Sequence, residues 1–296
     1  MKIRTLDQGN IEQFKAYCRK YKYVHDESFL YDEDLDAFEI GEKNPTKLLI
    51  DDGKVVGVIS LIISDHFTKA EKTRVRIFHC EETTIEYYRS LVESVLPLRG
   101  EIKKIEMYLP VNLLKDQAII EALNFTYNRT SYVMVRKNKD RVGLAFEQGY
   151  KLKPFREGID EEAFCHVRNV AFAALKGSEV PITKSMVREL YQAKDLLKEG
   201  MQILWHEEKP VGVVRMLHEF DEGQDYSFVA PIALIPEYQG RGLGGKLLQA
   251  GIYIGQQNGY DNSMLSVNGE NENALTLYKR EGFEIDFEVS NFVKKV

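Results

Sequence analysis

The sequence predicts an α/β fold of two tandem domains, each a mixed, mostly antiparallel sheet flanked by helices. In the second half, short strand-like runs alternate with helix-like runs, and the first half repeats the same order. A shift of 158 positions lays Phe125, Val135 and Lys137 on Phe283, Val293 and Lys295, and a shift of 155 lays Gly57 on Gly212. Matches at two separate elements indicate an internal duplication.

The first copy reads as a series of short elements joined by polar turns. The stretch KLLIDDGKVVGVISLII has the alternation and the turn residues of a hairpin. In order, we expect a helix at 11–20, the hairpin at 47–63, a strand at 74–78, a helix at 84–96, a strand at 103–109, a helix at 115–123 and a strand at 130–137.

The second copy has clearer periodicity and ends with a strand of the same kind. We expect a strand at 150–155, helices at 160–172 and 183–198, a hairpin at 201–217, a strand at 226–235, a helix ending near 257, a strand at 263–268, a helix at 271–282 and a strand at 287–296. The polar stretch 136–149 reads as the join. The predicted domains are therefore 1–146 and 147–296.

Composition excludes several classes of partner. The net charge of −6 argues against a general nucleic-acid or anionic-membrane surface. No apolar run approaches the roughly 18 residues of a membrane span, and the amphipathic start lacks a signal-peptide core. Cys18, Cys80 and Cys165 form no C-x-x-C pair, which favours reduced thiols over a disulfide or metal site. We expect a cytoplasmic protein with no metal, nucleic-acid or membrane partner.

The stretch IPEYQGRGLGGKLL, residues 235–248, places four glycines just before a helix-like run. Free N–H groups at a helix N-terminus bind phosphate well when no side chain covers them. Pro231 in the preceding strand cannot donate a ladder hydrogen bond, so it predicts a bulge or an open edge. An extended ligand can pair with such an edge. Tight packing between strand and helix is the alternative explanation of the glycines.

A second segment, VNGENENALTLYKREGFE, follows at residues 267–284. Together the two segments resemble the GCN5-related N-acetyltransferase (GNAT) superfamily, which carries Q-x-x-G-x-G and then N-x-x-A-x-x-L-Y-x-x-x-G-F. The tandem layout is similar to mycothiol synthase, a two-repeat member whose C-terminal repeat is catalytic. The resemblance implies two GNAT-like domains and acetyl-CoA as co-substrate.

The resemblance also assigns roles to individual residues. Tyr278 matches the catalytic proton donor to the departing sulfur, and a main-chain N–H at Leu234 is placed to stabilise the oxyanion. From the residues alone, Tyr278 could instead fill the core, and Asn271 could cap a helix. The implied acetyl-CoA-binding residues are Leu234, Ile235, Pro236, Gln239, Gly240, Arg241, Gly242, Leu243, Gly244, Gly245 and Asn271.

One position departs from the pattern of the peptide N-terminal acetyltransferases in this superfamily. Their glutamate base corresponds to Ser266, which cannot accept a proton from an ammonium group. Asp225 and Glu222 are candidates only by their proximity in sequence, and both also read as solvated loop acids. The base is left unassigned.

Three functions are weighed on these grounds. The favoured one is acetyl transfer to a primary amine of a small molecule or peptide, by direct attack in a ternary complex, with a homo-oligomer possible. The alternative is a CoA-binding regulatory or scaffolding module. A site for another nucleotide ranks last, because the sequence has no P-loop or Rossmann fingerprint.

The first copy lacks these features. The shift of 158 places EETTIE, residues 81–86, opposite 239–244, Ile120 opposite Tyr278 and Leu113 opposite Asn271. Carboxylates there would repel a pyrophosphate, so we expect a degenerate copy that does not bind acetyl-CoA. Since the same fold position does without glycines, a ligand rather than packing is expected to explain them in the second copy.

Overall fold

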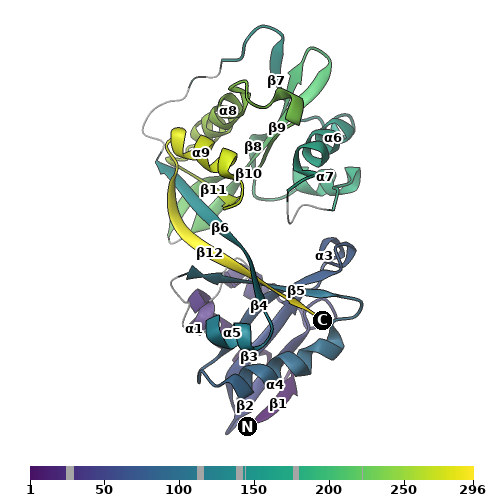
Figure 1. The fold of residues 1–296 in the computed structure, drawn as a ribbon, viewed down its shortest axis with the longest axis vertical. Coiled ribbons are helices and arrows are strands. Elements are labelled where there is room, and N and C mark those ends of the chain that lie inside the picture. The colour runs from purple at the N-terminus through teal and green to yellow at the C-terminus, as the bar shows by residue number, and fades with distance from the viewer. Residues whose placement is uncertain (25–29, 112–116, 138–142, 144, 176–179, 222) are drawn as a thin grey trace. The chain divides into compact units, whose positions relative to one another are not determined.

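The computed structural model describes residues 1–296 apart from 25–29, 112–116, 138–142, 144, 176–179 and 222. The chain divides into two compact units. Unit 1 comprises Met1–Ser131 and Phe287–Val296, and unit 2 comprises Tyr132–Asp286. Each unit is a mixed sheet with helices packed on it (Figure 1). The predicted fold class is thereby confirmed.

The first half of the chain supplies six strands. Its elements are β1 (Lys2–Thr5), α1 (Ile11–Tyr21), α2 (Asp32–Asp36), β2 (Thr46–Asp51), β3 (Lys54–Ile62), α3 (Asp65–Lys69), β4 (Lys72–Cys80), α4 (Ile85–Val95), β5 (Lys104–Pro110), α5 (Gln117–Ala122) and β6 (Thr126–Lys137). The short edge strand β1 has no counterpart among the predicted elements.

The second half supplies six more strands. Its elements are β7 (Tyr150–Pro154), α6 (Glu161–Phe172), α7 (Lys184–Tyr191), β8 (Leu196–His206), β9 (Lys209–Asp221), β10 (Gln224–Leu234), α8 (Leu243–Gln257), β11 (Asn262–Asn268), α9 (Glu272–Arg280) and β12 (Glu284–Lys295).

The prediction of a helix at 183–198 is wrong from residue 192 onwards. Helix α7 ends at Tyr191, and Leu196 already pairs with Leu217 as the first residue of β8. The ladder then shifts between Leu196 and Met201, where a Cβ on Gly200 would lie 2.6 Å from the Met216 carbonyl oxygen. The adjacent leucines imitate helical periodicity, but they belong to a bulged strand.

The last strands of the two repeats are exchanged. In unit 1 the order is β1-β2-β3-β4-β5-β12-β6, and in unit 2 it is β6-β11-β10-β9-β8-β7. By repeat position β5 corresponds to β11 and β6 to β12. However, β12 pairs antiparallel with β5, as Figure 1 shows, and β6 lies beside β11.

Two equivalent side chains show how complete the exchange is. Met134 and Phe292 are related by the shift of 158, and both are fully buried. Met134, from the first half of the chain, lies in the core of unit 2, while Phe292, from the second half, lies in the core of unit 1. The compact units are therefore discontinuous in sequence. The boundary at residues 146 and 147 stays a prediction about the repeats.

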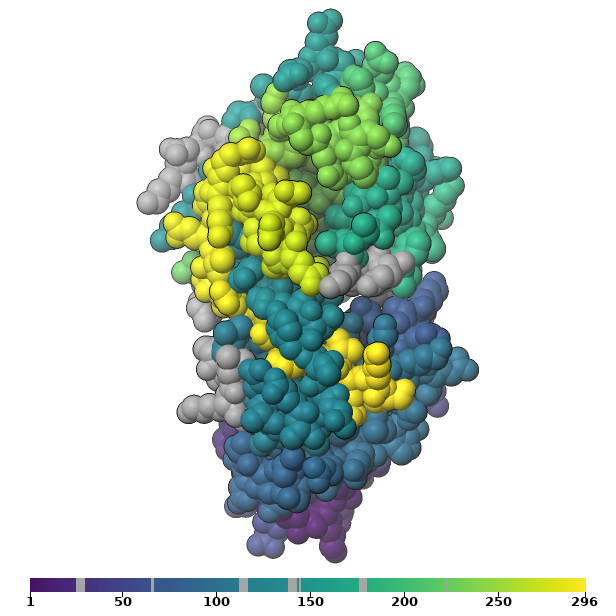
Figure 2. Space-filling model, in the orientation of Figure 1, coloured from purple at the N-terminus to yellow at the C-terminus, as the bar shows by residue number. Residues whose placement is uncertain are grey.

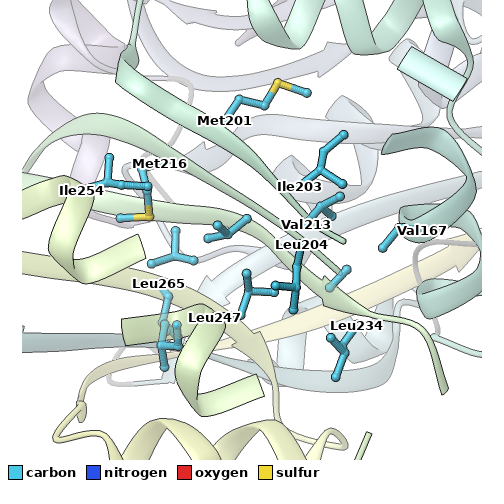
Figure 3. Close-up of a cluster of buried hydrophobic side chains, with 14 of the residues drawn as sticks. Val167, Met201, Ile203, Leu204, Val213, Met216, Leu234, Leu247, Ile254 and Leu265 are labelled. Atoms are coloured by element: carbon cyan, nitrogen blue, oxygen red, sulfur yellow. The ribbon is translucent and has the colours of Figure 1, made fainter. Parts of the chain in front are cut away.

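The core of unit 2 packs α8 against the central strands of its sheet, β9 and β10. Leu247 and Ile254 of α8 pack with Val213 of β9 and Leu265 of β11, as Figure 3 shows. Burying each such side chain contributes roughly 1.5–3 kcal/mol. This packing fixes the end of β10 beside the start of α8. Among the described residues, no helix combines the length and the apolar character that crossing a membrane requires.

Candidate functional site

A pocket of about 490 Å³ opens in unit 2 where the end of β10, the glycine turn, α8, α9 and the end of α6 come together. Most of the predicted site residues border it. Those in its lining are Leu234, Gln239, Gly240, Gly242, Gly244, Gly245, Asn271 and Tyr278.

Four predicted binding residues lie outside that lining. Ile235 and Leu243 are 1% and 3% exposed and belong to the core. Pro236 opens a short 3-10 turn, Pro236–Tyr238. The exposed Arg241 places its guanidinium carbon 5.1 Å from the centre of the Tyr238 ring. The side chains of these four residues therefore shape the turn rather than the pocket wall.

Strand β10 separates from β11 before it reaches the pocket. The two strands pair in parallel only from Ser227 to Val229, and the register between β10 and β9 shifts between Val229 and Ile232. Pro231 sits within this shift. The bulge or open edge predicted from that proline is therefore present, and it leaves a gap between the two strands.

The orientation of the main chain at the end of β10 follows from its hydrogen bonds. The Ile235 N–H donates to the Val211 carbonyl oxygen on β9 at 3.0 Å. Because successive N–H groups of a strand point to opposite edges, the Leu234 N–H is directed towards the gap. The Leu234 carbonyl oxygen on that same side accepts a hydrogen bond from Gln239 Nε2 at 2.8 Å. Gln239 therefore ties the glycine turn to the strand end.

Gly240 and Gly242 have backbone conformations that other residues rarely adopt. Their φ angles are +73° and +77°, and Gly242 is the residue that precedes α8. A Cβ at either position would meet nothing within 4 Å, so strain rather than crowding requires glycine here. The first N–H groups of a 15-residue helix are thereby left uncovered at the pocket.

Gly245 lies where the C-terminal end of α9 approaches α8. A Cβ there would lie 3.0 Å from Arg280 Nη2 and from Glu281 Oε1. Helices α8 and α9 adjoin at this point, and Figure 2 shows them side by side on the surface of unit 2. A Cβ at Gly245 would therefore require the ends of these two side chains to move by a few tenths of an ångström, so the close approach of α9 also favours glycine here.

Helix α9 carries the two remaining predicted residues. Asn271 caps it, with Oδ1 accepting from the Ala274 N–H at 3.2 Å, while it also lines the pocket. Tyr278 is 8% exposed and borders the same pocket. Burial raises the pKa of its hydroxyl to about 12, so the group is protonated at neutral pH. Within the described part of the chain, that hydroxyl makes no hydrogen bond.

Sequence reasoning missed part of the lining. Arg280 brings a positive charge to the pocket mouth, and Phe172 and Leu175 add an apolar wall from the end of α6. The basic last turn of α9, Lys279 and Arg280, was the available signal, since a cation beside a phosphate-binding turn is favourable.

The candidate bases are not at the pocket. Ser266 is exposed and outside the lining. Asp225 pairs with Phe220 at the start of β10, nine residues and so about 30 Å of extended strand from Leu234. It lies 3.7 Å from His218 Nε2 and borders a different pocket, so it cannot serve here. Glu222 lies outside the described residues. Among the described residues of the lining, none is a carboxylate.

In unit 1, the main-chain N–H that is equivalent to that of Leu234 already has a hydrogen-bond partner. Gly57 pairs with Cys80 as Gly212 pairs with Leu234, which makes Cys80 the counterpart of Leu234. The Cys80 N–H donates to the buried Tyr88 hydroxyl at 3.2 Å. Glu81 accepts from Lys20 and from the Tyr21 hydroxyl. The main-chain N–H that is directed towards the gap in unit 2 is therefore already bonded in unit 1.

Comparison with known proteins agrees with this geometry. Residues 162–283 match the model of the Acetyltransferase (GNAT) family. This match covers most of unit 2 and includes the glycine turn and α9. It is also similar to mycothiol acetyltransferase from Kocuria rhizophila, with 30% identity over 146 residues, which are 48% of this chain and 48% of that relative. The chain thus matches about half the length of that protein.

Two solved structures share the fold over nearly the whole chain. A GCN5-related N-acetyltransferase from Sphaerobacter thermophilus has 15% identity, covers 99% of this chain and 95% of its own, and has a TM-score of 0.70. A tandem GNAT protein from the clavulanic acid biosynthesis pathway has 12% identity, covers 99% and 98%, and has a TM-score of 0.70. The fold of both units is therefore that of tandem GNAT proteins.

Proposed function

We propose that the chain is an acetyl-CoA-dependent N-acetyltransferase that acetylates a primary amine of a small molecule or peptide. The observation that carries the proposal is the convergence on one pocket of the opened end of β10, the first turn of α8 and the Tyr278 hydroxyl. Unit 2 carries both cofactor binding and catalysis. Similarity to mycothiol acetyltransferase and to other GNAT proteins supports acetyl transfer and leaves the acceptor open.

The residues present fit acetyl-CoA. The uncovered N–H groups at Leu243, Gly244 and Gly245 suit a pyrophosphate, and the Arg280 guanidinium adds a cation at the pocket mouth. The gap beside β10 offers main-chain groups to the two amides of pantetheine. When bound, acetyl-CoA supplies an acetyl group activated as a thioester.

The protein groups then have separate tasks. The Leu234 N–H is directed towards the gap, where it can stabilise negative charge that develops on the acetyl oxygen. Tyr278 holds a proton at its hydroxyl at neutral pH and can deliver it to a departing thiolate. The amine attacks directly, so no cysteine is needed as a nucleophile.

The proton of the acceptor ammonium has no side-chain destination in the described lining of the pocket. We propose that water takes it, or that the amine binds in its neutral form. Unit 1, with the Cys80 N–H bonded to Tyr88 and a carboxylate at Glu81, is proposed to leave acetyl-CoA to unit 2.

The test is an assay of thiol release from acetyl-CoA against a broad panel of amines, with CoA binding measured by calorimetry in parallel. We expect turnover with at least one amine and one CoA bound per chain. Tight CoA binding without turnover on any amine would favour the CoA-binding regulatory or scaffolding module instead, and the lack of a carboxylate in the described lining is the observation that keeps this alternative open.

A further inference from the structure

Two arginines and a tyrosine in unit 1 form a group on β4, β5 and β6 that the proposed function does not use. Its centre is Tyr108 of β5. The Arg74 guanidinium carbon stands 4.3 Å from the centre of the Tyr108 ring, and Arg129 Nη2 donates to the Tyr108 hydroxyl at 2.9 Å. Two guanidinium groups from different strands therefore converge on one tyrosine.

Arg129 is the unusual member of this group. The residue is only 7% exposed, and its Nε is a buried donor with no hydrogen-bond partner. Among the described residues, no carboxylate forms an ion pair with it, and the neutral Tyr108 hydroxyl is its side-chain contact. Buried cations are normally paired with an anion, and each unmet buried donor costs free energy.

The carboxylate of Glu106, on the same strand as Tyr108, already pairs with a lysine. Both carboxylate oxygens of Glu106 lie 3.3 Å from Lys72 Nζ, and this pair is itself largely buried. Glu106 and Lys72 balance each other. The charge on Arg129 therefore remains to be matched by something other than the described residues of unit 1.

The pairing of β4 with β5 ends beside this group. Strands β4 and β5 pair in parallel only from Lys72 to Arg74 and from Lys104 to Glu106. Tyr108 lies two residues beyond the last pair, where the strands separate, and it is half-buried rather than sealed. By the shift of 158, Tyr108 stands at the position of Ser266 in unit 2. The same shift places Arg74 opposite Ile232 and Arg129 opposite Phe287, so unit 1 carries two guanidinium groups where the second repeat has apolar side chains.

We propose that Arg129, Arg74 and Tyr108 form an anion site in unit 1 for the carboxylate or phosphate group of a small ligand. Arg129 brings an Nε–H that has no hydrogen-bond partner, and the planar guanidinium group is the side chain that suits such oxyanions. Arg74 contributes a second cation, and Tyr108 holds both groups in place. This site shares no residue with the lining of the Tyr278 pocket, and the proposal stands whether or not unit 2 is an enzyme.

The experiment measures binding of inorganic phosphate and of succinate to the full chain by calorimetry and thermal unfolding, against sodium chloride at matched ionic strength. We expect saturable binding of at least one anion, with a rise in Tm that chloride does not reproduce. Binding of phosphate alone assigns a phosphate ligand, and binding of succinate alone assigns a carboxylate. Absence of saturable binding of both anions overturns the proposal.

Variants locate the site. Arg129→Gln removes the charge and should weaken binding at least about tenfold, whereas Arg89→Gln, at an exposed arginine on α4, should leave it unchanged. Tyr108→Phe keeps the ring beneath Arg74 but frees Arg129, so it should weaken binding in a protein that still folds. If Arg129→Gln does not fold, Tyr108→Phe decides. Unchanged affinity in the folded variants overturns the site.

Discussion

At the scale of single residues, the proposed chemistry depends on one buried hydroxyl. Tyr278 combines 8% exposure with a place in the pocket lining, and burial is the cause that raises its pKa to about 12. A phenol that served only to fill the core would be expected to lie away from the pocket. Its place in the same pocket as Leu234, at the opened end of β10, is the observation that supports the proposed proton transfer to the departing thiolate.

Tyr278→Phe removes the proton and keeps the ring. We expect turnover to fall roughly 10²- to 10⁴-fold, the usual contribution of a positioned general acid, while CoA affinity changes little. Steady-state kinetics and calorimetry with CoA measure the two effects. Tyr127→Phe, at an exposed tyrosine of unit 1, is the matched control. An unchanged rate in Tyr278→Phe would remove Tyr278 from the mechanism.

The pH dependence of kcat/KM distinguishes two cases: the amine loses its proton to water, or a side chain of the protein accepts that proton. If the neutral amine is the reactive form, kcat/KM should rise tenfold per pH unit below the pKa of the acceptor amine and then level off. Tyr278 acts in its protonated form, and a pKa of about 12 keeps it protonated, so its ionisation should cause no fall before about pH 11. Two acceptors with different amine pKa values provide the measurement. A midpoint that stays fixed between them would indicate a base on the protein.

Gly242 tests the turn without changing any charge. At φ +77°, a Cβ is strained although space is open, so Gly242→Ala should cost about 1–2 kcal/mol and disturb the first N–H groups of α8. Asparagine tolerates this conformation better, so Gly242→Asn should lose less of both stability and CoA affinity. Thermal unfolding and calorimetry compare the pair. Equal behaviour of the two variants would count against backbone strain as the reason for glycine.

At the scale of elements, periodicity predicted most strands and helices, and the two GNAT motifs predicted which of them border the pocket. The exchange of β6 and β12 could not be predicted in this way. Duplication gives both strands the same apolar alternation, so either one can pair with β5 or with β11. The basic last turn of α9 was a signal for Arg280, but the approach of Arg280 to the pocket depends on α8 and α9 meeting at Gly245.

The exchange makes a prediction about where a mutation acts. Met134→Ala removes a fully buried side chain from the core of unit 2, although Met134 belongs to the first half of the sequence. We expect a loss of about 2–5 kcal/mol, with faster amide exchange in β10 and β11 and little change in β3. Hydrogen exchange read by mass spectrometry resolves the strands. Faster exchange confined to β2 and β3 would contradict the assignment of Met134 to unit 2.

At the scale of the whole molecule, a repeat of the sequence and a compact unit are different pieces of chain. The second repeat, predicted as 147–296, lacks the segment Tyr132–Lys137 that lies beside β11. It also retains Phe287–Val296, whose Phe292 is buried in the core of unit 1. Expressed alone, it would leave one edge of β11 open and one strand without its partner β5.

Two fragments make the comparison. Residues 132–286 keep the core of unit 2, so we expect a folded fragment that binds CoA, whereas 147–296 should aggregate or bind CoA more weakly. Circular dichroism, size-exclusion chromatography and calorimetry provide the readout. The competing outcome has its own structure, because β12 has the repeat position of β6 and can fold back beside β11. If 147–296 folds as a monomer and binds CoA as tightly as the full chain, β12 replaces β6 there, and the exchange is not needed to complete the site.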